Sequence, residues 1–144
     1  MSEKIYTARV KAVKGRNGHV ESDDGVLKLD LASPGAASKA GATNPEQLFA
    51  CGYAACFGSA VEVKAKAEKV AADNVTVDAE VTLNKDDSGF FLNVLLSVTL
   101  PGVAGDVAEK IVQEAHKICP YSKATRGNIK VDIKVNDQNL KIAA

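Results

Sequence analysis

Three cysteines are the residues of this sequence with the widest range of chemistry. They are Cys51, Cys56 and Cys119. An odd number does not fit a disulfide framework, and the first residues lack the basic-then-apolar pattern of a secretory leader. In a reducing compartment a cysteine is either a small core residue or a reactive group. We therefore considered nucleophilic, redox and metal chemistry for each thiol.

Cys51 and Cys56 fall in one predicted helix and cannot bridge each other there. Five helical residues advance the chain by ~7.5 Å and turn it by ~140°. That separation exceeds the roughly 7 Å limit between the Cα atoms of a disulfide. We expect the two thiols to point to different faces, with Cys51 as a core residue.

Two glycines, Gly52 and Gly58, flank Cys56 in this helix. A helical glycine costs about 1 kcal/mol relative to alanine, so a neighbouring group must approach closely. Close packing against another element explains this, and so does a narrow cavity leading to the Cys56 sulfur. Composition alone favours close packing.

Cys119 stands at a break between helical segments, within His116-Lys117-Ile118-Cys119-Pro120-Tyr121-Ser122. The end of one helix would disfavour a thiolate there, whereas the start of another would favour it. A metal site is disfavoured because the chain has only two histidines and no Cys-x-x-Cys pair. A Cys–His hydrolase would need an imidazole beside the nucleophile, and the spacing of His116 and Cys119 is common by chance.

Composition describes an ordinary globular protein. The 144 residues are 46% hydrophobic and 25% charged, and 18 basic residues balance 18 acidic ones. These values argue against disorder and against a polyanion-binding surface. The longest charge-free apolar stretch, Leu48 to Val61, is shorter than the ~20 residues that cross a bilayer. We expect a soluble, cytoplasmic protein.

Period-2 and helical patterns predict the elements that hold these thiols. Asn44, Pro45 and Gln47 form a helix start that resembles a capping box. The following segment is apolar on all sides, which predicts a buried helix. The predicted order is a strand at 6–12, a hairpin turn at 15–18, a strand at 27–31, a loop at 32–42, a helix at 45–69, strands at 75–83 and 90–100, a helix at 105–118 and a strand at 129–135.

Because helices and strands do not alternate, this order predicts an α+β fold of mostly antiparallel sheets with a long buried central helix. We expect a single domain at 1–136. The residues at 137–144 have no pattern and are interpreted as a C-terminal tail.

Two stretches carry a family resemblance. Asn44 to Phe57 reads NPEQLFACGYAACF, and His116 to Val131 reads HKICPYSKATRGNIKV. Both resemble the organic hydroperoxide resistance (Ohr) proteins of the OsmC-like superfamily, over nearly the whole chain. The resemblance implies the OsmC/Ohr-like fold, an intertwined homodimer, and a thiol peroxidase of oxidative stress defence that reduces organic hydroperoxides to alcohols.

The same resemblance assigns residues. It implies that Cys56 is the peroxidatic cysteine, Cys119 the resolving cysteine, and Arg16 the active-site arginine paired with Glu46. Cys51 departs from the family, in which alanine is more usual. The resemblance further implies no bound cofactor or metal, and a lipoylated protein (dihydrolipoamide) as the reductant.

The assigned residue types fit that chemistry. A thiolate attacks the peroxide, and a guanidinium within ~4–6 Å favours the charged sulfur. A carboxylate can fix the planar guanidinium with paired hydrogen bonds. Phe49, Tyr53 and Phe57 could form a pocket for the carbon tail of the substrate, or could be ordinary core residues.

Glu46 and Cys56 are ten residues apart, which is ~15 Å along a helix. Either Arg16 spans this gap, or the Arg16–Glu46 pair reaches a cysteine across a subunit interface, which is our hypothesis. Two alternatives to an Ohr-type enzyme are an OsmC-like hydroperoxidase with other substrate preferences and a non-catalytic module that binds thiols or small apolar ligands.

Overall fold

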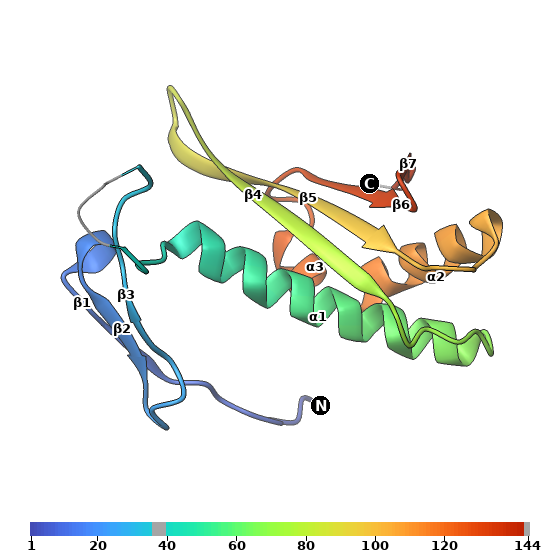
Figure 1. Cartoon of the computed structure of the whole chain (residues 1–144), viewed down its shortest axis with the longest axis horizontal. Helices are drawn as coiled ribbons and strands as arrows, with labels where there is room; N and C mark the ends of the chain where they lie inside the picture. Colours follow the sequence, from blue (N-terminus) through green and yellow to red (C-terminus); the bar gives the residue numbers. More distant parts are fainter. Residues whose placement is uncertain (36–39, 143–144) are drawn as a thin grey trace. The chain divides into compact units, whose positions relative to one another are not determined.

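The computed structural model describes residues 1–35 and 40–142 (Figure 1). Two compact units, Met1–Leu48 and Phe49–Ala144, make up the chain. Part of the loop expected at 32–42 and the last two residues of the expected tail lie outside the described residues.

The first unit contains a three-stranded antiparallel sheet in the order β1-β2-β3. Its strands are β1 (Val10–Val13), β2 (His19–Ser22) and β3 (Lys28–Asp30), and a 3-10 turn, η1 (Gly15–Asn17), joins the first two. The predicted hairpin is therefore confirmed. Lys14 and Gly15 take the left-handed conformation at its start, with φ of 60° and 53°.

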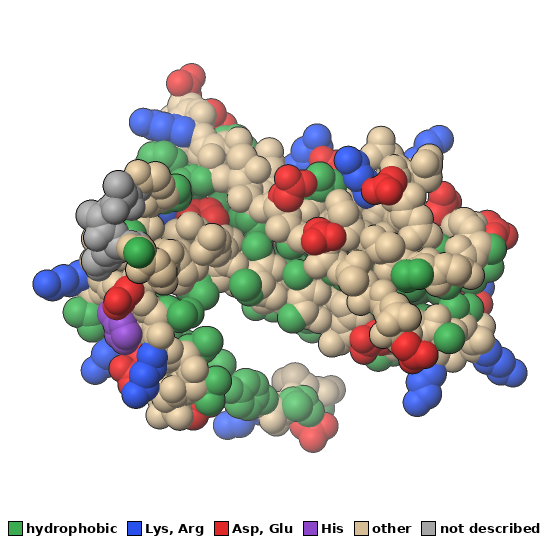
Figure 2. Space-filling model, viewed as in Figure 1, with side chains coloured by type: hydrophobic (Ala, Val, Ile, Leu, Met, Phe, Trp, Pro, Cys, Tyr) green, Lys and Arg blue, Asp and Glu red, His purple; other side chains and the backbone are tan. Residues whose placement is uncertain are grey.

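The predicted first strand is wrong in its extent and burial. The chain has no strand at 6–9, and the apolar residues of β1 are exposed. An alternating pattern predicts a half-buried strand only where a second layer covers the sheet. Figure 2 shows apolar side chains on the surface of this unit. The large exposed ones are Met1, Ile5, Tyr6, Val10, Val13, Val26 and Leu27.

The helix α1 (Pro45–Ala67) is capped as the sequence predicts, although only half of the capping box forms. The side-chain oxygen of Asn44 accepts a hydrogen bond from the backbone N–H of Gln47, at 2.9 Å. The side chain of Gln47 instead accepts from the Thr43 hydroxyl, at 2.6 Å. Asn44 thus satisfies one of the free amides that every helix start exposes.

The prediction that this helix is buried on every side is wrong. Tyr53, Phe57 and Val61 are fully buried, whereas Cys51 and Ala55 are exposed. Helical geometry places the two sets on different faces, and only one face packs on the core of the second unit. Cys51 is therefore a surface thiol of the chain rather than a core residue.

The second unit contains a four-stranded sheet in the order β4-β5-β6-β7. The strands β4 (Thr76–Asp86) and β5 (Gly89–Thr99) form an antiparallel hairpin. The chain then passes through α2 (Gly105–Ile118) and α3 (Pro120–Thr125) before β6 (Val131–Val135). Because of this helical crossover, β6 pairs parallel to β5. The other pairings are antiparallel, as predicted.

The end of the chain is more ordered than its sequence indicates. Gln138–Asn139 form β7, which pairs antiparallel with β6, and Leu140 is buried. Asn136 and Asp137 take left-handed backbone conformations that allow the reversal, with φ of 46° and 67°. A two-residue strand is too short to leave a periodic pattern, which is why 137–144 reads as a tail.

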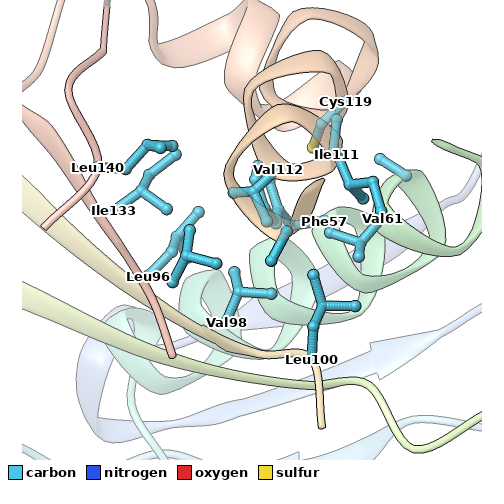
Figure 3. Packing of buried hydrophobic residues seen from close by; sticks show 14 of the residues in the cluster. Phe57, Val61, Leu96, Val98, Leu100, Ile111, Val112, Cys119, Ile133 and Leu140 are labelled. Carbon is cyan, nitrogen blue, oxygen red and sulfur yellow. The ribbon is translucent and has the colours of Figure 1, made fainter. Parts of the chain in front are cut away.

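One hydrophobic core lies between the sheet and the helices of the second unit (Figure 3). Phe57 and Val61 of α1 meet Ile111 and Val112 of α2 in this core. The strands contribute Leu96, Val98 and Ile133. Cys119 belongs to the same core and is fully buried, so the packing that stabilises the fold also fixes one of the thiols.

Candidate redox-active thiol site

The sulfur atoms of Cys56 and Cys119 lie 3.7 Å apart, with the thiol of Cys119 donating toward Cys56. Both cysteines are free. Cys56 is on the third to fourth turn of α1, and Cys119 is the single residue between α2 and α3. A disulfide has sulfurs about 2.05 Å apart. The two thiols can therefore be joined by a small movement of either side chain.

The junction between α2 and α3 explains the placement of Cys119. Its backbone is extended, with φ of −61° and ψ of 122°, and Pro120 takes the first position of α3. The residue before a proline avoids the helical conformation, so α2 ends at Ile118. Proline is also suited to a first helical position. The Cys-Pro sequence thus turns Cys119 out of the first helix.

The surroundings of Cys56 within the second unit disfavour its charged form. Burial raises the pKa of the Cys56 thiol, and the backbone N–H of Tyr121 lowers it by hydrogen bonding to the sulfur. The neighbouring Cys119 raises this pKa further, through the side-chain hydrogen bond between the two thiols and then through charge repulsion. Within the second unit, burial is therefore the largest influence against a Cys56 thiolate.

Arg16 and Glu46 form a bidentate ion pair in the first unit. The two terminal nitrogens of the guanidinium donate to the two carboxylate oxygens, at 2.9 and 2.7 Å. The Arg16 hydrogen bonds lower the pKa of Glu46, and the Glu46 carboxylate raises the pKa of Arg16. This pair stays ionised, and its geometry fixes the plane of the guanidinium.

The four predicted residues thus occur as two pairs, the thiols in one unit and the ion pair in the other. The side chain of Arg16 is 46% exposed, whereas that of Glu46 is 13% exposed. The guanidinium therefore keeps an exposed side and free N–H groups while its other edge is bound to Glu46. Such a group can donate to an anion or to a peroxide oxygen.

The three predicted pocket rings differ in their exposure. Tyr53 and Phe57 are fully buried, whereas Phe49 is half-buried. Tyr53 packs edge-on against Phe49, with ring centroids 6.3 Å apart. A cavity of about 370 Å³ beside His116 contacts none of these rings and neither thiol.

Tyr121 is a site residue that the sequence motifs did not single out. Its backbone N–H reaches the Cys56 sulfur, and its ring packs on Phe49 and Tyr53, with centroid distances of 6.2 and 5.6 Å. A Cβ at Gly52 would overlap the Tyr121 hydroxyl and lie 2.9 Å from its ring carbon. Close packing against Tyr121 therefore accounts for Gly52. This glycine within a helix was the feature of the sequence that could have indicated a close neighbour here.

A buried polar network was also missed. The hydroxyl of Ser122 lies 2.8 Å from that of Tyr53 and 2.9 Å from Nδ1 of His116. His116 thus bonds to Ser122 rather than to Cys119, which gives no support to a Cys–His hydrolase. In the described part of the chain, no three metal-ligating side chains form a group that could hold an ion.

Burial lowers the pKa of His116, and the charge of Arg126 lowers it further. The unfolded chain should bind a proton near pH 6.5, at which the folded chain still resists protonation. The contribution of the neutral His116 side chain to folding stability is therefore complete above pH 6.5. This contribution is lost as the pH falls from 6.5 toward the lower pKa that His116 has in the folded chain.

We expect unfolding in urea to need less denaturant at pH 5.5 than at pH 7.5, and His116→Gln to reduce that difference. An unchanged difference in His116→Gln would contradict this assignment.

The family model for OsmC-like proteins matches residues 37–134 of this chain. That range includes the helix with Cys56 and the junction with Cys119. The chain therefore belongs to the OsmC-like family.

Individual relatives indicate which proteins of the OsmC-like family this chain resembles. The chain is 51% identical over 140 residues to organic hydroperoxide resistance protein OhrA of Bacillus subtilis, covering 94% of this chain and 99% of that protein. The crystal structure of OhrB of the same species matches with a TM-score of 0.85 and 47% identity, over 90% of this chain and 98% of that one. A putative organic hydroperoxide resistance protein from Vibrio cholerae, with captopril bound in one of its active sites, matches with a TM-score of 0.88 and 42% identity, over 96% of both chains. These relatives confirm the resemblance to Ohr proteins, with the role in organic hydroperoxide resistance and oxidative stress defence that the family implies.

None of the helices in the described ranges has the length and apolarity needed to span a membrane.

Proposed function

We propose that this protein is a cysteine-based peroxidase that reduces organic hydroperoxides to alcohols, with Cys56 as the attacking thiol and Cys119 as the resolving thiol. The observation that supports this most strongly is the 3.7 Å separation of the two sulfurs. A binding module would not require two facing thiols. The resistance function of the relatives agrees with this chemistry.

The first step is attack of the Cys56 thiolate on one peroxide oxygen. The O–O bond breaks, Cys56 becomes a sulfenic acid, and the other oxygen leaves as an alkoxide that takes a proton to become the alcohol. In the second step the Cys119 sulfur displaces hydroxide from this sulfenic acid. A disulfide and one molecule of water result, and the thiol of Cys119 provides the proton.

Arg16 is proposed to provide the positive charge that the thiolate needs. Burial raises the pKa of Cys56, and a guanidinium beside the sulfur would lower it again. The same group would stabilise the alkoxide as it leaves. Glu46 would act by orienting the guanidinium through the bidentate pair.

We propose that this charge comes from the other subunit of a homodimer. Glu46 is ten residues before Cys56 on α1, or ~15 Å along the helix. The apolar surface of the first unit and the exposed Cys51–Ala55 side of α1 would be covered in such a dimer. Covering them would stabilise the pair by the hydrophobic effect.

A mixed dimer tests this arrangement. One subunit carries Arg16→Gln and the other carries Cys56→Ser, each with a different affinity tag. If Arg16 serves the cysteine of its partner, this dimer has one complete site. We then expect about half of the wild-type activity, although the Cys56→Ser homodimer is inactive and the Arg16→Gln homodimer is nearly so. An inactive mixed dimer, or a monomer by sedimentation, would contradict the proposal.

The disulfide must be opened by an external dithiol, and we propose a lipoylated protein in this role, with no bound cofactor. Two thiol–disulfide exchanges would pass the two electrons of dihydrolipoamide to Cys56 and Cys119. We place this cycle in the cytoplasm, where reducing conditions suit a protein with free thiols.

For the carbon tail of the substrate we propose a contact with Phe49, backed by Tyr53 and Phe57. Phe49 is the one of the three that keeps exposed surface in the chain. The full burial of the other two favours a core role, in which they hold Phe49 and α1 in place.

Thiol titration tests the proposed function. Treatment with tert-butyl hydroperoxide should remove two of the three thiols, and dihydrolipoamide should restore them. An unchanged thiol count would favour the binding module. A preference for hydrogen peroxide over the organic hydroperoxide would instead favour an OsmC-like enzyme with other substrates.

A further inference from the structure

The network of Tyr53, Ser122 and His116 is buried beside the thiol pair, and the redox steps do not use it. Tyr53 and Ser122 have no exposed surface, and His116 is 8% exposed. Ser122 joins the other two, at 2.8 Å from the Tyr53 hydroxyl and 2.9 Å from the His116 ring.

The members of this network flank the two cysteines in sequence. Tyr53 is three residues before Cys56 on α1, and Ser122 is three residues after Cys119 on α3. Residues three apart are neighbours on a helix surface. The Tyr53–Ser122 hydrogen bond and the Cys56–Cys119 contact therefore connect the same two parts of the chain, about one turn from each other.

The ends of the network are also anchored. The Thr125 hydroxyl donates to the Ser122 carbonyl at 3.2 Å, which leaves its oxygen to accept from Tyr53 at 3.3 Å. Arg126 donates to the His116 carbonyl at 2.5 Å. These bonds tie the end of α2 and the whole of α3 together on both sides of Cys119, which itself makes no side-chain capping bond.

We propose that Tyr53, Ser122 and His116 are positioning residues that hold the Cys119 sulfur against Cys56, so that the sulfenic acid is resolved before a second hydroperoxide reaches it. This inference rests on the proposed function. The network would act on the second chemical step and not on the first.

Two reactions compete for the sulfenic acid. Condensation with Cys119 forms the disulfide and releases water, at a rate that does not depend on hydroperoxide concentration. Reaction with a second hydroperoxide gives a sulfinic acid and another alcohol, at a rate proportional to that concentration. The sulfurs must close from 3.7 Å to about 2.05 Å, with a restricted dihedral angle. A loosened α3 would slow only the condensation.

The test measures the first-order rate of disulfide formation after one equivalent of tert-butyl hydroperoxide, by acid quench and mass spectrometry. We expect Ser122→Ala and Tyr53→Phe each to lower this rate about tenfold, since correct orientation accounts for much of the speed of an intramolecular reaction. Excess hydroperoxide should then convert a larger fraction of Cys56 to sulfinic acid. Cys119→Ser cannot form the intramolecular disulfide, so it gives the lower limit of this rate and the upper limit of the sulfinic acid fraction.

A matched control removes the same group elsewhere. Ser88→Ala deletes a hydroxyl in the turn between β4 and β5 and should form the disulfide at the wild-type rate. Tyr53→Phe keeps its ring and its packing, so it decides the matter if Ser122→Ala does not fold.

The outcomes separate the two proposals. If the wild-type protein forms no Cys56–Cys119 disulfide, the proposed function is wrong. If the wild type forms it and the folded network variants do so equally fast, the positioning role is wrong. A lower melting temperature with an unchanged rate would likewise show that the network only stabilises the fold.

Discussion

Replacing Cys56 with serine is expected to reduce hydroperoxide consumption to the level measured without protein. Serine is nearly the same size, so the packing of α1 around this half-buried position should persist. A serine hydroxyl is not ionised near neutral pH and is a much weaker nucleophile than a thiolate. The measurement is the loss of tert-butyl hydroperoxide in the presence of excess dihydrolipoamide.

Cys51→Ser is the matched control for this variant. Cys51 lies on the same helix, five residues earlier, and its thiol is exposed. It should retain wild-type turnover because five helical residues turn it to a different face of α1 from Cys56. Residual turnover in Cys56→Ser, or its loss in Cys51→Ser alone, would mean that the wrong thiol has been assigned.

Replacing Arg16 with glutamine is expected to lower turnover by about 10²–10³-fold, the usual effect of removing one donor that stabilises an anionic transition state. The substitution removes the charge and the fork that binds Glu46. Burial raises the pKa of Cys56, so without the cation the thiol should stay protonated to higher pH. The pH at which iodoacetamide begins to alkylate Cys56 should rise accordingly.

Two further arginine variants sharpen this result. Arg16→Lys keeps the charge without the bidentate geometry, so its turnover should fall between wild type and Arg16→Gln. Arg9→Gln removes a cation from the same unit, at an exposed position, and should have little effect. Wild-type turnover in Arg16→Gln would refute the role of this cation.

Local signals in the sequence predicted much of the fold. The turn around Arg16 was recoverable because hairpins leave patterns within a short window. The two alternating strands, predicted at 75–83 and 90–100 and found at 76–86 and 89–99, were recoverable in the same way. The Asn44 cap and the Cys119-Pro120 break were recoverable because helix starts and ends are also marked by a few neighbouring residues. The contact between Cys56 and Cys119 could not come from spacing, since 63 residues separate them, and it was implied only by the family resemblance.

Features that depend on tertiary packing were not predictable in this way. An apolar α1 reads as buried on all sides, yet the position of Cys51 depends on which face meets the core. The short β7 has too few residues to show a period. The Tyr53–Ser122 hydrogen bond joins residues that are 69 apart in the sequence. From the sequence alone, Tyr53 looks like any core tyrosine and Ser122 like any serine at the start of a helix.

The most direct test of the redox pair is peptide mapping under non-reducing conditions, after one equivalent of tert-butyl hydroperoxide and alkylation of the remaining thiols. We expect one intramolecular crosslink between the peptides that contain Cys56 and Cys119, with Cys51 alkylated. A crosslink through Cys51, or three alkylated cysteines, would contradict the account.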